Sequence, residues 1–186
     1  MKDEWAFVLD FLAKGHVSQR REEPISQLLG EKYFSLLEIA VREGVNLLLE
    51  DKVYIGEGKR DQVKFIKRTL SVKDLTATAR NELELLIEKI VLQDEKRFVE
   101  FFNKAGPLTT RMHQLEVLPG VGKKHLWSIL EARKEEPFES YDDIKKRLPL
   151  LISPVKMVKN RIIEELENDD ERHYIFVLSK IKRDMF

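Results

Sequence analysis

The chain has 186 residues, of which 42% are apolar, with eight glycines, six prolines and no cysteine. This composition is typical of a globular protein, and the absence of cysteine excludes disulfides and thiolate metal sites. Lysine plus arginine and aspartate plus glutamate both total 33, so no global positive field favours nucleic acid. No apolar run is long enough to span a bilayer, and the N-terminus lacks a basic secretion signal, so we expect a cytoplasmic protein that does not bind membranes.

Short runs rich in β-branched and aromatic residues recur before about residue 70. The predicted strands are Glu4–Phe11, Tyr33–Val41, Val45–Glu50, Val53–Ile55 and Gln62–Arg68. Five strands in so short a segment favour a small antiparallel barrel, in which closure removes the exposed sheet edges. A helix is the alternative for Tyr33–Val41, because SLLEIAV also fits a period of 3.6 residues.

After residue 70 the apolar spacing is helical. One long helix is predicted up to Ala105, because apolar residues recur on one face from Ala79 and Gly106-Pro107 follows as a stop signal. Capping residues and a first-turn proline mark the other helix starts. The other predicted helices run from Thr110 to about Val117, over Lys123–Lys134, from Ser140 to about Leu148 and from Ser153 to about Asn168. His173–Leu178 (HYIFVL) is predicted as a last strand or a docking tail.

These patterns predict an α+β protein with two domains, a small antiparallel β-barrel at residues 1–70 and a helical module at residues 71–186. Within the module, Leu115–Glu131 aligns with Leu148–Glu164. The alignment predicts two tandem helix-break-helix units. The second unit is degenerate, because the positions of Pro119, Gly120 and Gly122 are taken by Ile152, Ser153 and Val155.

The first break, Leu118-Pro119-Gly120-Val121-Gly122, carries the main chemical signal. Glycine costs about 1 kcal/mol and proline about 3 kcal/mol relative to alanine inside a helix, so this stretch separates two helices. Gly120 and Gly122 permit positive φ and place no Cβ before a ligand, and Val121 can anchor the turn in the core. The N–H groups near Lys123 lie where a helix begins and attract an anion, and Lys123 and Lys124 add positive charge. Backbone phosphate is the predicted guest.

This stretch resembles the helix-hairpin-helix motif, over about residues 111–133. In its known families that motif binds the sugar-phosphate backbone of DNA or RNA without reading sequence. The match departs from the motif at Leu126, where a small residue is expected. Arg111 before the hairpin, and Lys67 and Arg68 at the edge of the barrel, are further candidate nucleic-acid-binding residues. A purely structural turn or a protein contact is the alternative for the hairpin, and a solvated strand face is the alternative for the barrel.

The resemblance extends from Trp5 to about Val177. Four stretches look like hallmarks of an archaeal family known as domain of unknown function 655: Tyr33–Glu38, Val53–Gly56, Arg97–Ala105 and Thr110–Glu116. The resemblance implies a barrel like the oligonucleotide-binding fold, followed by helix-hairpin-helix units. It implies binding of a nucleotide or a nucleic acid and no established enzymatic activity.

The sequence offers no convergent catalytic or metal-binding set. The four histidines have no HxxxH spacing, and GxxxxGK[ST] is absent. We therefore expect a non-catalytic nucleic-acid-binding protein, with no cofactor or metal, that prefers RNA slightly over DNA. The alternatives are a protein-binding adaptor or assembly factor in a ribosomal or transcriptional complex, and an uncharacterised enzyme that processes nucleic acid or nucleotides.

Overall fold

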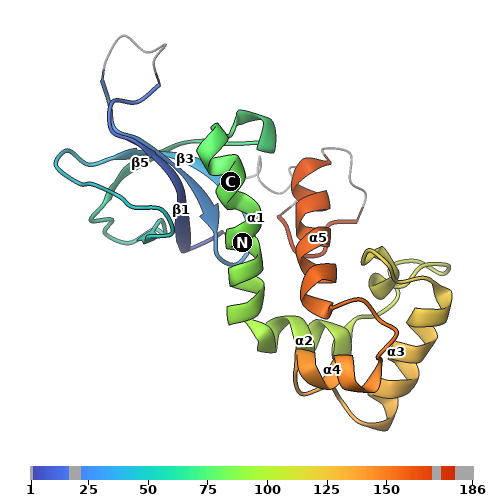
Figure 1. The fold of residues 1–186 in the computed structure, drawn as a ribbon. Coiled ribbons are helices and arrows are strands. Elements are labelled where there is room, and N and C mark those ends of the chain that lie inside the picture. The colour runs from blue at the N-terminus through green and yellow to red at the C-terminus, as the bar shows by residue number, and fades with distance from the viewer. Residues whose placement is uncertain (1, 17–21, 169–172, 179–186) are drawn as a thin grey trace. The chain divides into compact units, whose positions relative to one another are not determined.

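The protein folds as an α+β structure in two compact units (Figure 1). The computed structural model describes residues 2–16, 22–168 and 173–178. Of these, residues 2–86, 166–168 and 176–178 form the first unit, and residues 87–165 and 173–175 form the second. The two units divide between Leu86 and Ile87, inside the first long helix of the chain. The last strand of the sheet ends at Thr69, next to residue 70, where the sequence analysis placed the end of the barrel.

The first unit is built on a five-stranded antiparallel sheet. Its strands are β1 (Trp5–Leu12), β2 (Ile25–Gly30), β3 (Leu36–Val41), β4 (Lys52–Tyr54) and β5 (Val63–Thr69). Their order in the sheet is β4-β1-β2-β3-β5, with every neighbouring pair antiparallel. Register shifts in the β1–β2 and β3–β5 pairs bend the strands, and the sheet curls into a half-barrel.

The prediction that this barrel closes is wrong. In the described part of the chain, β4 and β5 are the two edges of the sheet and do not pair with each other. β4 has only three residues, so it offers little backbone for a closing ladder. The half-barrel instead buries one apolar cluster on its inner side, which includes Val8, Leu28, Ile39, Val53 and Val63.

The predicted strands differ from the observed ones in two places: one observed strand was not predicted, and one predicted strand is not formed. β2 has no counterpart among the predicted strands because all six of its residues are buried, so its sequence does not alternate between apolar and polar. Its polar Gln27 is satisfied by the backbone, because Thr76 N donates to Oε1 at 2.9 Å and Nε2 donates to Asp74 O at 3.2 Å. The predicted strand Val45–Glu50 is not formed, since Glu50 has a φ of +64° and Asp51 Oδ2 accepts from Leu48 N to make a turn.

The region Tyr33–Val41 contains a strand and not a helix. β3 occupies Leu36–Val41, and the preceding Phe34 has a φ of +53°, which is incompatible with a continuous helix. Buried Asp3 fixes this turn, because its Oδ1 accepts from Lys32 N and Tyr33 N, each at 2.8 Å. Gly30 is required beside it, since a Cβ there would lie 2.0 Å from Asp3 Oδ2.

The predicted long helix is two helices, α1 (Ala77–Gln93) and α2 (Glu95–Lys104), which meet at Asp94. Asp94 falls one turn after buried Ile90, where the apolar face of α1 would otherwise continue. The backbone leaves the helical conformation at this residue, with φ −99° and ψ 42°. A capping box at Ser71 and Asp74 begins the short 3₁₀ helix η1 (Val72–Asp74), which precedes α1.

The second unit also contains η2 (Gln114–Val117), α3 (Lys123–Glu135), α4 (Tyr141–Arg147) and α5 (Pro154–Glu167). α3, α4 and α5 confirm three predicted helices. The prediction that Thr110 caps the short helix is wrong, because His113 is the N-cap of η2 and its Nδ1 accepts from Leu115 N at 3.1 Å. Residues 173–178 form no strand; Leu178 N instead donates to Tyr33 O at 3.2 Å. Within the described residues, no helix is long and apolar enough to cross a membrane.

Candidate nucleic-acid interface

The hairpin Leu118–Lys124 joins η2 to α3 through a tight turn. Gly120 has a φ of +86°, and Val121 N donates to Leu118 O at 3.1 Å. Val121 is buried, so the turn is held to the core at its centre. His125 Nδ1 lies 2.9 Å from Gly120 O, and this contact ties the turn to the first turn of α3.

The two glycines of the hairpin differ in backbone conformation and in the space available for a Cβ atom. Gly120 has left-handed backbone, and a Cβ there would lie 2.7 Å from Cδ1 of Ile152. Gly122 is the N-cap of α3 with φ −88°, a conformation open to any residue, and a Cβ there would meet nothing within 4 Å. The fold therefore requires glycine at 120, whereas the space in front of Gly122 is open.

The two lysines of the hairpin are also unequal. Lys123 Nζ lies 2.7 Å from Oε1 of Glu116 and also donates to Arg111 O at 3.3 Å. The hydrogen bond from Lys123 lowers the pKa of Glu116, which also accepts from His113 N. Lys124 has no ion-pair partner within the described ranges and is exposed. Of the two lysines, Lys124 is therefore the one that is available to a ligand. Arg111 is also exposed, and its backbone carbonyl is the oxygen that accepts from Lys123 Nζ.

A second loop lies next to the hairpin, where Ile152 approaches Gly120. This loop follows α4, and with α3 it forms a pocket of about 220 Å³. The residues that line the pocket are Lys124, His125, Ser128, Arg147, Leu148, Pro149, Leu150 and Leu151. The aligned positions Leu118 and Leu151 are both buried, as are Ile129 and Ile162, while the assignment of two helix-hairpin-helix units stays a prediction.

Sequence reasoning missed the apolar side chains around this surface. Trp127 on α3 is 62% exposed, and Leu150 and Ile152 in the second loop are 79% and 52% exposed. Periodicity does not reveal them, because an apolar residue in a helix is expected to be buried. The one available signal is position: Trp127 lies on the side of α3 opposite to buried Ile129 and one turn after Lys124.

The two candidate residues of the sheet unit are engaged with acids. Lys67 Nζ on β5 lies 2.8 Å from Oε2 of Glu23. Arg68 lies 3.3 Å from Glu38 through Nε, and 3.5 Å from Asp74 through Nη1. Glu38 is buried, and its hydrogen bond raises the pKa of Arg68. Both cations therefore already have carboxylate partners within the first unit.

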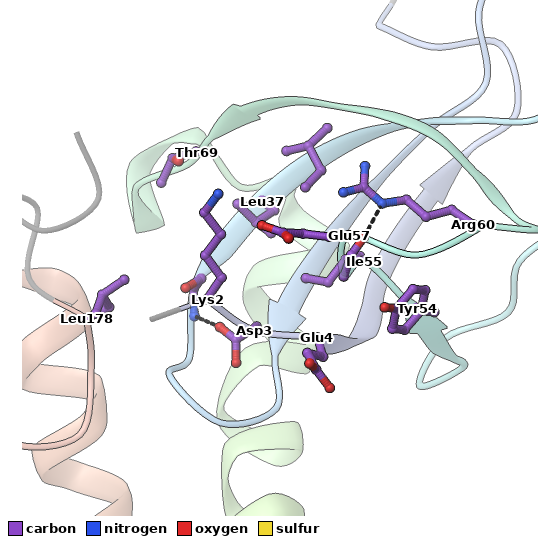
Figure 2. Close-up of a pocket in the computed structure, with 13 residues that line it drawn as sticks. Lys2, Asp3, Glu4, Leu37, Tyr54, Ile55, Glu57, Arg60, Thr69 and Leu178 are labelled. Carbon is purple, nitrogen blue, oxygen red and sulfur yellow. Dashed lines mark hydrogen bonds between the residues drawn. The ribbon is translucent and has the colours of Figure 1, made fainter. Parts of the chain in front are cut away.

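A larger pocket, of about 660 Å³, lies in the sheet unit between its two edges (Figure 2). Tyr54 of β4 and Ile66 and Thr69 of β5 contribute to its walls. The loop between β4 and β5 also lines the pocket, and Arg60 holds this loop because its Nε donates to Gly56 O at 2.7 Å. The charged groups at the pocket are mixed, because Glu4 and Glu57 line it together with Lys2 and Arg60. It therefore has no excess of positive charge to attract a polyanion.

Three histidines have structural partners. His113 caps η2, and burial lowers its pKa. His125 contacts Gly120 O, and His16 Nε2 lies 2.7 Å from Glu38 Oε2. Among the residues that the structure describes, no three His, Asp or Glu side chains gather in a way that could hold a metal ion.

Comparison with known proteins identifies relatives along nearly the whole chain. An uncharacterized protein of Methanocaldococcus jannaschii is 40% identical over 176 residues, which cover 94% of this chain and 80% of the relative. The crystal structure of the protein Af1531 from Archaeoglobus fulgidus is 47% identical, with a TM-score of 0.87 over 95% of this chain and all of the other. The sequence model of the family described as protein of unknown function (DUF655) matches residues 2–178. The chain therefore belongs to the archaeal DUF655 family, as its sequence predicts.

Proposed function

We propose that this protein binds the phosphate backbone of nucleic acid without reading sequence and without catalysis, and that it prefers RNA slightly over DNA. The contact site is the hairpin Leu118–Lys124, a helix-hairpin-helix turn. The observation that carries the proposal is the open, glycine-lined start of the 13-residue helix α3, with exposed Lys124 beside it.

The glycine at position 122 supports a close ligand. Its backbone is not left-handed and no neighbour would obstruct a Cβ, so the fold itself does not demand glycine there. Without a side chain, a phosphate oxygen can approach the N–H groups of the first turn, which have no partner inside the helix. Lys124 then supplies charge that offsets part of the phosphate's negative charge.

The expected affinity is modest because little free positive charge surrounds the hairpin. Lys123 already neutralises Glu116, so a phosphate competes with that carboxylate for the same ammonium group. A small number of phosphate contacts gives weak binding that falls steeply with salt. The curled five-stranded sheet supports a single-stranded ligand, because sheets of the oligonucleotide-binding type bind single-stranded RNA and DNA, and the paired RNA and DNA titrations test the preference for RNA.

The test compares single lysine substitutions in titrations of mixed-sequence RNA and DNA at several salt concentrations. Lys124→Ala is expected to weaken binding to all sequences and to lower the salt slope by about 1, since one phosphate contact is lost. Lys123→Ala is expected to have a smaller effect, because the ammonium group of Lys123 is held by Glu116 and would have to leave that carboxylate to contact a phosphate. The control is Lys96→Ala, which removes an equal charge from the exposed face of α2 in the same unit.

Equal binding by wild type and the Lys123→Ala/Lys124→Ala double variant at every salt concentration would contradict this site. Purification from cells with and without nuclease distinguishes the main alternative. A protein partner that stays bound after RNA and DNA are destroyed would support the adaptor interpretation instead. Conversion of labelled RNA, DNA or nucleotides by the protein with divalent ions would support an enzyme.

A further inference from the structure

Trp127 lies beside the hairpin without being part of the core. It follows Lys124 by three residues on α3, so the two positions are about 60° apart around the helix and about 4.5 Å apart along its axis. Helical side chains lean toward the N-terminus, so the indole covers the surface over the first turn of α3. The exposed ring therefore shares a helix face with Lys124, one turn from the start of α3.

The large exposed area of the Trp127 ring favours a binding partner for it. Trp127 is 62% exposed, although tryptophan is among the largest apolar side chains and gains most from being covered. Its polar neighbours on the same helix face are Lys124 and Glu131, and no other aromatic ring of the described residues stacks on it. A flat π-surface one turn from a cation is the arrangement that stacks a base while its phosphate is bound.

The other flank of Lys124 carries the pocket of about 220 Å³. Its walls are apolar on the loop side, where Leu150 is 79% exposed, and polar on the α3 side, where His125 and Ser128 lie. Lys124 thus lies between an aromatic surface and an apolar recess. A chain that crosses α3 at Lys124 would have one base at Trp127 and the next near Leu150.

We propose that the hairpin surface binds single-stranded nucleic acid, with a phosphate at Gly122–Lys124 and an unpaired base stacked on Trp127. This inference rests on the proposed function and names its substrate class. Bases inside a duplex are stacked on each other, so a duplex cannot offer a free base to the indole. Among the described residues of the hairpin surface, Arg111 and Lys124 are exposed and have no carboxylate partner, so positive charge is available for one or two phosphates of a single strand.

The first experiment is fluorescence titration of the Trp5→Phe variant, in which Trp127 is the one remaining indole of the chain. Phenylalanine keeps the aromatic contact that Trp5 makes with Tyr54, whose ring centroid lies 5.1 Å away. The probes are a short oligouridine, the matching oligothymidine and a duplex hairpin of equal charge. Binding of either single strand is expected to quench Trp127 emission, while the duplex leaves it unchanged.

The second experiment measures Kd for Trp127→Ala with the same probes. Loss of one stacked base is expected to weaken single-strand binding by about 5- to 150-fold and duplex binding by less than about twofold. Trp127→Phe should retain most of the affinity. The control is Leu92→Ala, which removes an exposed apolar side chain of α1 from the same unit. Trp127→Ala should fold normally, because the side chain it removes is exposed.

The outcomes separate this inference from the proposed function. If Lys124→Ala weakens binding but Trp127→Ala does not, or if Trp127→Ala weakens duplex and single strand equally, base stacking is overturned and phosphate binding stands. If wild type binds none of the probes, both proposals fail. If Trp127 proves to be covered by a protein that survives nuclease treatment, the surface is a protein interface and the inference is overturned.

Discussion

Gly120 and Gly122 provide the sharpest test, because the structure predicts opposite consequences for the same substitution two residues apart. Gly120→Ala is expected to destabilise the protein. Left-handed backbone costs an L-residue about 1–2 kcal/mol, and at 2.7 Å the new Cβ would force Cδ1 of Ile152 to move. We expect the free energy of unfolding to fall by about 1–3 kcal/mol.

Gly122→Ala is expected to change stability by less than about 0.5 kcal/mol. Alanine restricts the unfolded chain and so stabilises by about 0.4–1 kcal/mol, whereas alanine is a poorer N-cap than glycine by a similar amount. The new methyl group would occupy the open space before the first turn of α3. Nucleic-acid binding should therefore weaken although the fold is unchanged.

The assay is urea denaturation followed by circular dichroism, paired with binding titrations of each folded variant. Ile152→Ala, alone and combined with Gly120→Ala, separates the steric contact from backbone strain in a double-mutant cycle. The combined variant should recover part of the loss but not all of it, because the left-handed φ remains. A Gly120→Ala variant as stable as wild type, or an unfolded Gly122→Ala variant, would contradict these two expectations. Unchanged binding by Gly122→Ala would remove the argument for close phosphate approach.

Two further predictions concern stability. Burial raises the pKa of Glu38, but hydrogen bonds from His16 and Arg68 outweigh it and hold that pKa below its ordinary value of 4.5. The stabilisation is therefore present above pH 4.5 and is lost as the pH falls through the lower, folded-state pKa. Glu38→Gln should reduce the free energy of unfolding by about 1–3 kcal/mol at pH 7 and flatten its dependence on pH in the acid range. Urea titrations at several acid pH values measure this dependence. The same dependence of the unfolding free energy on pH in the variant and in wild type would contradict a stabilising role for the contacts of Glu38 with His16 and Arg68. Asn103 accepts from Phe138 N and donates to Phe138 O, each at 2.8 Å, so Asn103→Ala should lower thermal stability by about 1–3 kcal/mol, whereas an unchanged melting temperature would contradict this role.

Local signals in the sequence predicted most of the helical unit. Ser140 accepts from Asp143 N and begins α4, and Pro154 begins α5, because a cap and a first-turn proline act within a few residues of the chain. The break at Gly120 was predictable for the same reason. The predicted long helix is interrupted at the exposed Asp94, where the backbone leaves the helical conformation between α1 and α2.

The candidate site was predictable only in outline. The hairpin and its lysines are visible in the sequence, but the ion pair between Lys123 and Glu116 is a contact across the turn that spacing does not reveal. The same limit applies to the pairs Lys67–Glu23 and Arg68–Glu38, whose members are 44 and 30 residues apart in the chain. Counting basic residues therefore overstated the charge available to a ligand.

By itself the sequence determined the α+β class, the family, the starts of α3, α4 and α5 and the glycine turn, since each depends on neighbouring residues or on similarity along the chain. The tertiary structure decided that β2 is a central strand, that the sheet stays open, and that Trp127 is exposed. These features depend on which distant segments cover each other. Burial and pairing are set by packing over the whole unit, so no local pattern could have fixed them.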